Sequence, residues 1–164
     1  MSFIQLLRST LSSPSEFVTI RDEFRVLQQY VDIQKFRYDD GFQVVFECDE
    51  AVEEKKIPKL LIQPLLENAI FHGVEFKKGE GLIIITARKK DGDVVVTVED
   101  NGMGIAPEVI EKIERGEQIN EKTHVGIVNV KERIQLNFGE SYGMNIESRQ
   151  WEGTKIVLTF PAID

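Results

Sequence analysis

The sequence has little of what would connect it to a membrane or to nucleic acid. No stretch reaches the roughly 18 uninterrupted apolar residues of a membrane span, and no basic region with an apolar signal core follows Met1. The 28 acidic residues outnumber the 20 basic ones, so the net charge of -8 would repel a polyphosphate backbone. We therefore expect no membrane span within the chain and no nucleic acid among its partners.

Cysteine and histidine are also scarce. The single Cys48 cannot form an internal disulfide, and it ends an alternating apolar run that starts at Phe42, which predicts a buried thiol. A free thiol fits a reducing cytoplasm. His72 and His124 have no cysteine or second histidine at ligand spacing, so a zinc site is not expected.

The length of 164 residues and the hydrophobic content of 41% are typical of one globular domain. Apolar residues recur at helical spacing after a capping signal at Thr19, and Asp91 with Gly92 marks a hairpin between two β-rich runs. Helices alternate irregularly with hairpin-connected strands, which predicts an α+β sandwich with helices on one face of a mostly antiparallel sheet. The expected helices cover about 19–38, 58–71, 107–116 and 125–138, and the expected strands 42–48, 82–87, 94–99, 142–149 and 154–160.

Three separated segments carry the functional signal. They are Glu67 with Asn68 late in a predicted helix, residues 100–104 after a predicted strand, and Gly126 with Asn129 at the start of another helix. In this order and spacing they resemble the N box and the two glycine boxes of the GHKL ATPases, the superfamily of gyrase, the Hsp90 chaperone, histidine kinases and MutL. Within it, the run over 57–70 is similar to the LytS-type sensor kinases.

The resemblance implies a Bergerat-type two-layer α/β sandwich, with a mixed and mostly antiparallel sheet, that binds ATP and Mg²⁺. It assigns 41–164 to the catalytic domain, and 1–40 to a remnant of the dimerisation and linker helices that lacks the acceptor histidine. The implied activity is transfer of the ATP γ-phosphoryl group to a histidine on an upstream helix. The implied partners are that helix and a response regulator, in a homodimeric, membrane-attached protein whose catalytic domain is cytoplasmic.

The resemblance also assigns roles to individual residues. Glu67 and Asn68 are the implied catalytic residues, and Asn68 is the implied magnesium ligand. The implied nucleotide contacts are Asn68, His72, Asp100, Gly102, Met103, Gly104, Ile105, Thr123, His124, Val125, Gly126, Ile127 and Thr154.

Each box also has a physical reason. A buried carboxylate such as Asp100 accepts a hydrogen bond from the adenine amino group, whereas guanine presents a carbonyl oxygen there. Gly102 and Gly104 remove Cβ atoms where the backbone approaches a flat ligand. One amide oxygen from Asn68 suffices for Mg²⁺ beside a triphosphate, because this ion prefers to keep waters and phosphate oxygens. The helix that Gly126 opens offers unpaired N–H groups to phosphate.

Other interpretations stand beside these. Glu67 would act as a base toward water in hydrolytic relatives; here we expect it to orient or polarise water or magnesium, because a neutral imidazole supplies its own lone pair. Thr154 resembles a strand threonine that supports the adenine site through water, but its β-propensity alone also explains it. Asp100, Asn101 and Gly102 taken alone are ordinary turn chemistry.

Three positions depart from the resemblance. Where relatives read Gly-Thr-Gly-Ile-Gly-Leu, residues 122–127 place Lys122 and His124 at two of the glycines. Phe71 stands where many relatives carry a basic residue. The sequence thus leaves two alternatives to a kinase, namely a hydrolytic or conformational GHKL ATPase and a nucleotide-sensing module without catalysis. The altered second glycine box favours the sensor, and the upstream segment over 30–35 favours the kinase.

Overall fold

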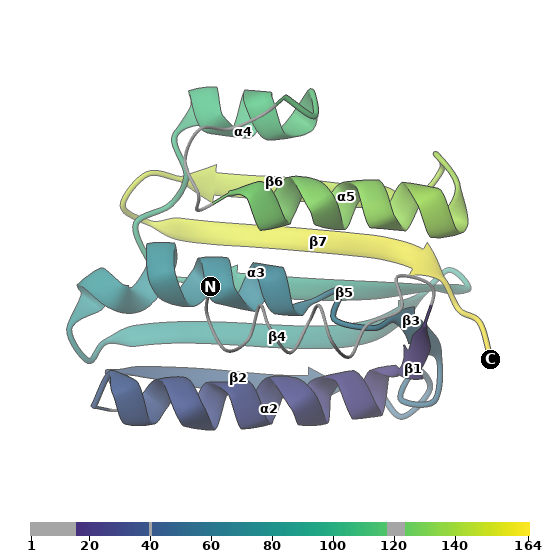
Figure 1. Cartoon of the computed structure of the whole chain (residues 1–164), viewed down its shortest axis with the longest axis horizontal. Coiled ribbons are helices and arrows are strands. Elements are labelled where there is room, and N and C mark those ends of the chain that lie inside the picture. The colour runs from purple at the N-terminus through teal and green to yellow at the C-terminus, as the bar shows by residue number, and fades with distance from the viewer. Residues whose placement is uncertain (1–15, 40, 118–123) are drawn as a thin grey trace.

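A mixed sheet forms one layer of the molecule and helices form the other (Figure 1). The computed structural model describes residues 16–39, 41–117 and 124–164. Across the sheet the spatial order is β2 (Phe42–Cys48), β4 (Gly81–Lys90), β5 (Asp93–Asp100), β7 (Gly153–Pro161) and β6 (Gly143–Arg149).

Helices cover one face of this sheet. Figure 1 shows α2 (Ile20–Arg37), α3 (Gln63–Asn68) and α5 (Val125–Phe138) in front of the strands, while α4 (Pro107–Glu114) lies beyond the β6 edge. After α3 the chain continues through a π-helical turn, η1 (Ala69–Gly73), and a 3₁₀ turn, η2 (Val74–Lys77). The expected α+β sandwich is confirmed.

Strand alternation explains why only one face is covered. In β7, Thr154, Ile156, Leu158 and Phe160 are buried, and the residues between them are only partly buried. Successive side chains of a strand point to opposite faces, so this pattern directs one set toward the helices. The pairs β4–β5, β5–β7 and β7–β6 are antiparallel, whereas β2 pairs in parallel with β4.

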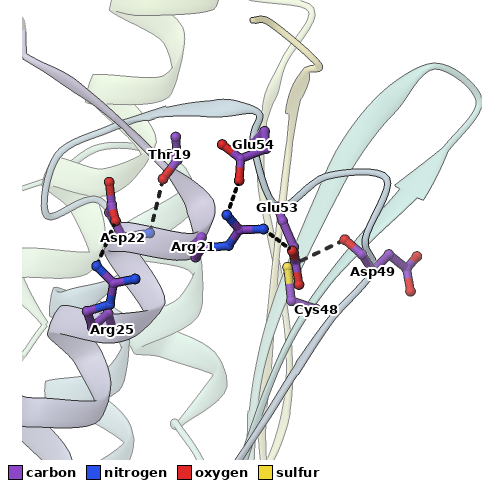
Figure 2. Close-up of polar contacts among 8 residues, drawn as sticks. All are labelled: Thr19, Arg21, Asp22, Arg25, Cys48, Asp49, Glu53 and Glu54. Atoms are coloured by element: carbon purple, nitrogen blue, oxygen red, sulfur yellow. Dashed lines mark hydrogen bonds and ion pairs between the residues drawn. The ribbon is translucent and has the colours of Figure 1, made fainter.

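The start of α2 is fixed to the loop that follows β2. The Thr19 hydroxyl accepts a hydrogen bond from the Asp22 amide at 3.1 Å, which confirms the predicted cap. Arg21 forms ion pairs with Glu53 and Glu54 (Figure 2). Just before the helix, β1 (Phe17–Thr19) pairs with β3 (Lys56–Pro58) in a separate two-stranded sheet.

The predicted helix over 58–71 begins too early. Pro58 ends β3, and Leu60 has a left-handed backbone with φ 59°, so the helix starts only at Gln63. Leu61 and Ile62 are fully buried, as are the first leucines of α3. A run that is buried on every side has no helical periodicity, so Pro64 is the one local signal of the true start, since proline favours the first turn of a helix.

The other strand expectations hold closely. The strand over 42–48 appears with those bounds, and Asp91 and Gly92 form the hairpin turn, each with a positive φ. Cys48 is half-buried, and burial raises the pKa of its thiol to about 11. Within the part of the chain that is described, no helix has the length and apolar character needed to cross a membrane.

Candidate functional site

Asp100 is a buried carboxylate at the end of β5. Its exposed fraction is only 7%, and its Oδ1 accepts a hydrogen bond from the Gly102 amide at 2.8 Å. Burial raises the pKa of Asp100 to about 6, against the lowering effect of the Gly102 and Thr154 amides. A carboxylate has about four lone-pair positions, so two backbone amides leave room for a further donor.

A row of polar side chains crosses the sheet from Asp100. Thr154 is its register partner on β7, and Ser148 is the partner of Thr154 on β6. The Ser148 hydroxyl lies 2.9 Å from the Thr154 hydroxyl, accepts from the Ile105 amide at 2.7 Å and donates to the Gly153 carbonyl at 3.0 Å. Sequence reasoning missed Ser148, because nothing in a single strand reveals its neighbour across the sheet.

A cavity of about 560 Å³ lies beside this row. Asp100, Ser148 and Thr154 contribute polar groups to it, and Ile110 and Ile146 contribute apolar surface. Polar groups that converge beside apolar surface are typical of a small-molecule site, although most of this lining is polar or charged. The remaining lining residues are Glu99, Glu147, Arg149, Glu152, Gly153 and Lys155.

The first glycine box makes close backbone contacts. A Cβ atom on Gly102 would lie 2.1 Å from the Gly73 carbonyl, and the Met103 amide donates to that same carbonyl at 3.2 Å. Gly104 has φ +75°, and a Cβ there would lie 2.2 Å from the Arg149 carbonyl. Both positions require glycine because a Cβ atom would overlap neighbouring protein backbone. The sequence analysis predicted the same residues for a different reason, namely the approach of a ligand.

Sequence reasoning missed Gly73, which contacts both Asp100 and the first glycine box. A Cβ atom on Gly73 would lie 2.8 Å from Asp100 Oδ1. Its one sequence signal is its place directly after His72. Gly73 therefore lets the end of η1 lie against both Asp100 and Gly102.

Asn68 and the two histidines form a second polar group. Asn68 ends α3 with an exposed fraction of 5%, and its Oδ1 lies 3.0 Å from Nδ1 of the buried His124. The rings of His72 and His124 have centroids 5.6 Å apart. Glu67 is partly buried, and its carboxylate accepts from Gln63 at 3.5 Å. No group of three or more His, Cys, Asp or Glu among the described residues could hold a metal ion.

The start of α5 packs on α3. A Cβ atom on Gly126 would lie 3.0 Å from Cβ of Pro64, and the Ile127 side chain is fully buried in the core. Val125 is the first residue of α5, whereas Thr123 lies outside the described residues. Gly126 therefore allows α5 to pack closely on α3. Because the Ile127 side chain is buried in the core, it is not available to contact a nucleotide as the sequence predicts.

The structure thus brings most of the predicted residues to one end of the sheet. Asp100 and Thr154 line the cavity, whereas the two glycines of the first glycine box, Asn68 and the two histidines are not among its lining residues. Gly73 connects Asp100 and Gly102 to the helix end that carries Asn68. A buried acceptor, a cavity with some apolar surface and a buried amide oxygen suit an adenine nucleotide with a magnesium ion.

Comparison with known families agrees with this geometry. The family model described as "Histidine kinase-, DNA gyrase B-, and HSP90-like ATPase" matches residues 54–164, and the model described as "Histidine kinase" matches residues 1–42. The two matched regions leave out residues 43–53, which include most of β2.

Similar proteins include the sensor histidine kinase YesM of Bacillus subtilis (strain 168), 39% identical over 95% of this chain and 26% of its own length. The sensor histidine kinase YpdA of Escherichia coli (strain K12) is 38% identical over 89% of this chain and 25% of its own length. The chain thus spans about a quarter of these relatives. A nucleotide-free catalytic domain of the histidine kinase ThkA superposes with a TM-score of 0.68 at 21% identity, covering 91% of this chain and 99% of that domain, and shares the fold.

Proposed function

Because this chain belongs to the family of histidine kinase-, DNA gyrase B- and HSP90-like ATPases, we propose that it binds Mg-ATP and transfers the γ-phosphoryl group to a histidine outside the chain. The upstream match over 1–42 to the histidine kinase family supports a kinase over a hydrolytic ATPase. Phosphoryl transfer needs mainly positioning and charge neutralisation, which a rigid two-layer fold can supply.

The buried carboxylate of Asp100 is the observation that carries the proposal. It lies at the wall of the cavity with acceptor capacity left over from its two amide partners. An adenine amino group is a donor of the right kind for it, and guanine has none at that position. Ile110 and Ile146 supply apolar surface for the base, and Thr154 with Ser148 supplies hydroxyl groups beside it.

The polyphosphate would extend toward Asn68. This amide oxygen is buried at the end of α3, where it can reach an ion shared with the phosphates. When bound, Mg²⁺ neutralises charge on the phosphate oxygens. Glu67 adjoins Asn68 and would orient water or the ion. His72 would contact a phosphate oxygen, because its ring lies beside that of His124, which contacts Asn68.

The wider setting is also part of the proposal. The acceptor histidine would lie on an upstream helix, in a longer homodimeric protein attached to a membrane, with this domain in the cytoplasm. A response regulator would receive the phosphoryl group. We assign 41–164 to nucleotide binding and 1–40 to the linker and dimerisation region. Support comes from sensor kinase relatives about four times longer than the chain.

A nucleotide sensor without catalysis is the second candidate. The hydrogen bond between His124 and Asn68 favours it, because this bond engages the oxygen that a magnesium ion would need. A sensor would bind the nucleotide but would not transfer its phosphoryl group.

The deciding assay uses γ-labelled ATP with magnesium. The chain is incubated alone and with a separately expressed fragment that carries the upstream helix, and Asp100→Asn serves as the binding-deficient control. We expect acid-labile label on the added helix only. Label on this chain alone would show the acceptor to be misassigned. Tight ATP binding without any transfer would identify the sensor.

A further inference from the structure

We propose that Glu23 and Arg133 are positioning residues: their hydrogen bonds hold the turn before α3 and so set the orientation of Asn68. This turn, residues 59–62, is called the α3 entry turn below. The inference rests on the proposed function, since it concerns the magnesium ligand of that site.

Two helices hold the entry turn from opposite sides. From α2, the carboxylate of Glu23 accepts the Leu60 amide at 3.0 Å and the Ile62 amide at 3.4 Å. From α5, the guanidinium of Arg133 donates to the Lys59 carbonyl at 2.7 Å and to the Leu60 carbonyl at 3.2 Å. The amide of Leu60 thus donates to a carboxylate, and its carbonyl accepts from a guanidinium.

These hydrogen bonds stabilise a backbone conformation that leucine rarely adopts. Leu60 has φ 59°, in the left-handed region that disfavours a side chain with a Cβ atom. Such a conformation persists where the surrounding contacts over-determine it. Glu23 is only 1% exposed, and a carboxylate this deeply buried is costly unless it is well partnered. The entry turn therefore depends on these two charged side chains.

Hydrogen bonds continue from the entry turn to the site. The Ile62 carbonyl accepts the Leu65 amide at 2.9 Å and the Leu66 amide at 3.2 Å. The Ala69 amide donates in turn to the Leu65 and Leu66 carbonyls, directly after Asn68. Because α3 has only six residues, a displacement of its first turn must reach Asn68.

The hydrogen bonds to the entry turn also come from both of the regions that match family models. Glu23 lies in the region that matches the histidine kinase model, and Arg133 lies in the region that matches the ATPase model. A displacement of α2 would therefore act on α3 through Glu23.

The test compares ATP affinity with magnesium and with EDTA in the purified chain. Replacing Arg133→Met is expected to lower the magnesium-dependent gain in affinity by about tenfold, the scale for losing support behind a metal ligand, with affinity in EDTA unchanged. In an Asn68→Ala background the same substitution should have no effect. Arg133→Lys should recover part of the gain. Arg88→Met, which removes exposed ion pairs with Glu47 and Asp49 and touches neither α2 nor the entry turn, is the matched control and should change neither affinity.

Hydrogen exchange supplies a readout that needs no nucleotide. Arg133→Met should speed exchange of the amides in α3 and η1 and leave those of β5 and β7 unchanged. If Arg133→Met does not fold, Glu23→Gln replaces it in both measurements. An unchanged magnesium-dependent gain, or equal losses with magnesium and EDTA, would overturn the positioning role. If the wild-type chain bound no ATP, the proposed function would be rejected. The exchange data would still test whether Arg133 stabilises α3.

Discussion

Nδ1 of His124 lies 3.0 Å from Oδ1 of Asn68, so the side chain at the start of α5 engages the amide oxygen at the end of α3. Both side chains are buried, with exposed fractions of 7% and 5%. An imidazole N–H that donates to this oxygen occupies one of its two lone pairs. His124 and a magnesium ion would therefore compete for the same atom.

Replacing His124→Ala is therefore expected to strengthen magnesium-dependent ATP binding. A net hydrogen bond contributes about 1 kcal/mol, which corresponds to about a fivefold gain in affinity. Calorimetric titration with Mg-ATP measures the gain, and titration in EDTA is the control that should not change. Weaker binding of Mg-ATP by the variant would show that His124 holds the nucleotide instead of competing with the metal.

Asp100 is expected to select adenine. Its carboxylate can accept from the adenine amino group, whereas Asp100→Asn would present an N–H donor to that group or to the Gly102 amide. An unmatched buried polar partner costs about 1–3 kcal/mol, so the variant should bind ATP correspondingly more weakly. Calorimetry with ATP and GTP on both proteins checks this. Equal affinity of the wild-type chain for the two nucleotides would contradict base selection by Asp100.

The raised pKa of Asp100 predicts a pH dependence of stability. The carboxyl has a pKa of about 6 in the folded chain and its ordinary value of 3.8 when unfolded. The folded state thus holds the proton more tightly, so stability is fully present below the lower pKa and is lost as the pH rises through about 6. The expected loss is about 3 kcal/mol.

Urea unfolding without nucleotide, at pH values on either side of this window, measures the loss. Asp100→Asn cannot ionise at this position, so its stability relative to the wild-type chain should rise as the pH rises. A constant difference between the two proteins across the window would show that Asp100 titrates normally.

Gly102 provides a steric prediction. Its missing Cβ would lie 2.1 Å from the Gly73 carbonyl, which is backbone and cannot rotate away. Gly102→Ala should therefore lower the free energy of unfolding by about 3 kcal/mol or more, at the upper end for overpacking. Gly143→Ala is the control, because a Cβ there meets nothing within 4 Å, and its change should stay within about 0.5 kcal/mol. Equal unfolding midpoints for the two variants would refute the close contact.

Features encoded by neighbouring residues were predictable from the sequence. The Thr19 cap, the Asp91–Gly92 turn and the strand over 42–48 each depend on local patterns, and each is confirmed. The helix over 125–138 also appears with its predicted bounds. The order of the glycine boxes predicts Asp100 as a site residue. The structure places Asp100 at the cavity, and its role in the site stays a prediction.

Features that depend on contacts between distant segments were not predictable. The strands β1 and β3 have three residues each, too few to show alternation, and Pro58 was therefore read as the start of a helix. The contact of Gly102 with Gly73 and that of His124 with Asn68 join separate elements. Glu23 reads in the sequence as one more polar residue of α2, and only its burial reveals a role.

The insertion of β7 between β5 and β6 has a consequence for biosynthesis. Asp100 leaves the ribosome long before Thr154, its partner across the sheet, and until then the edge of β5 has no internal strand to pair with. Pairing over such a long sequence separation folds slowly and leaves strand edges open to aggregation. The proposed nucleotide pocket is therefore completed only after β7 has been made, much later than Asp100 and the first glycine box, so ATP cannot guide the folding of the segments made before it.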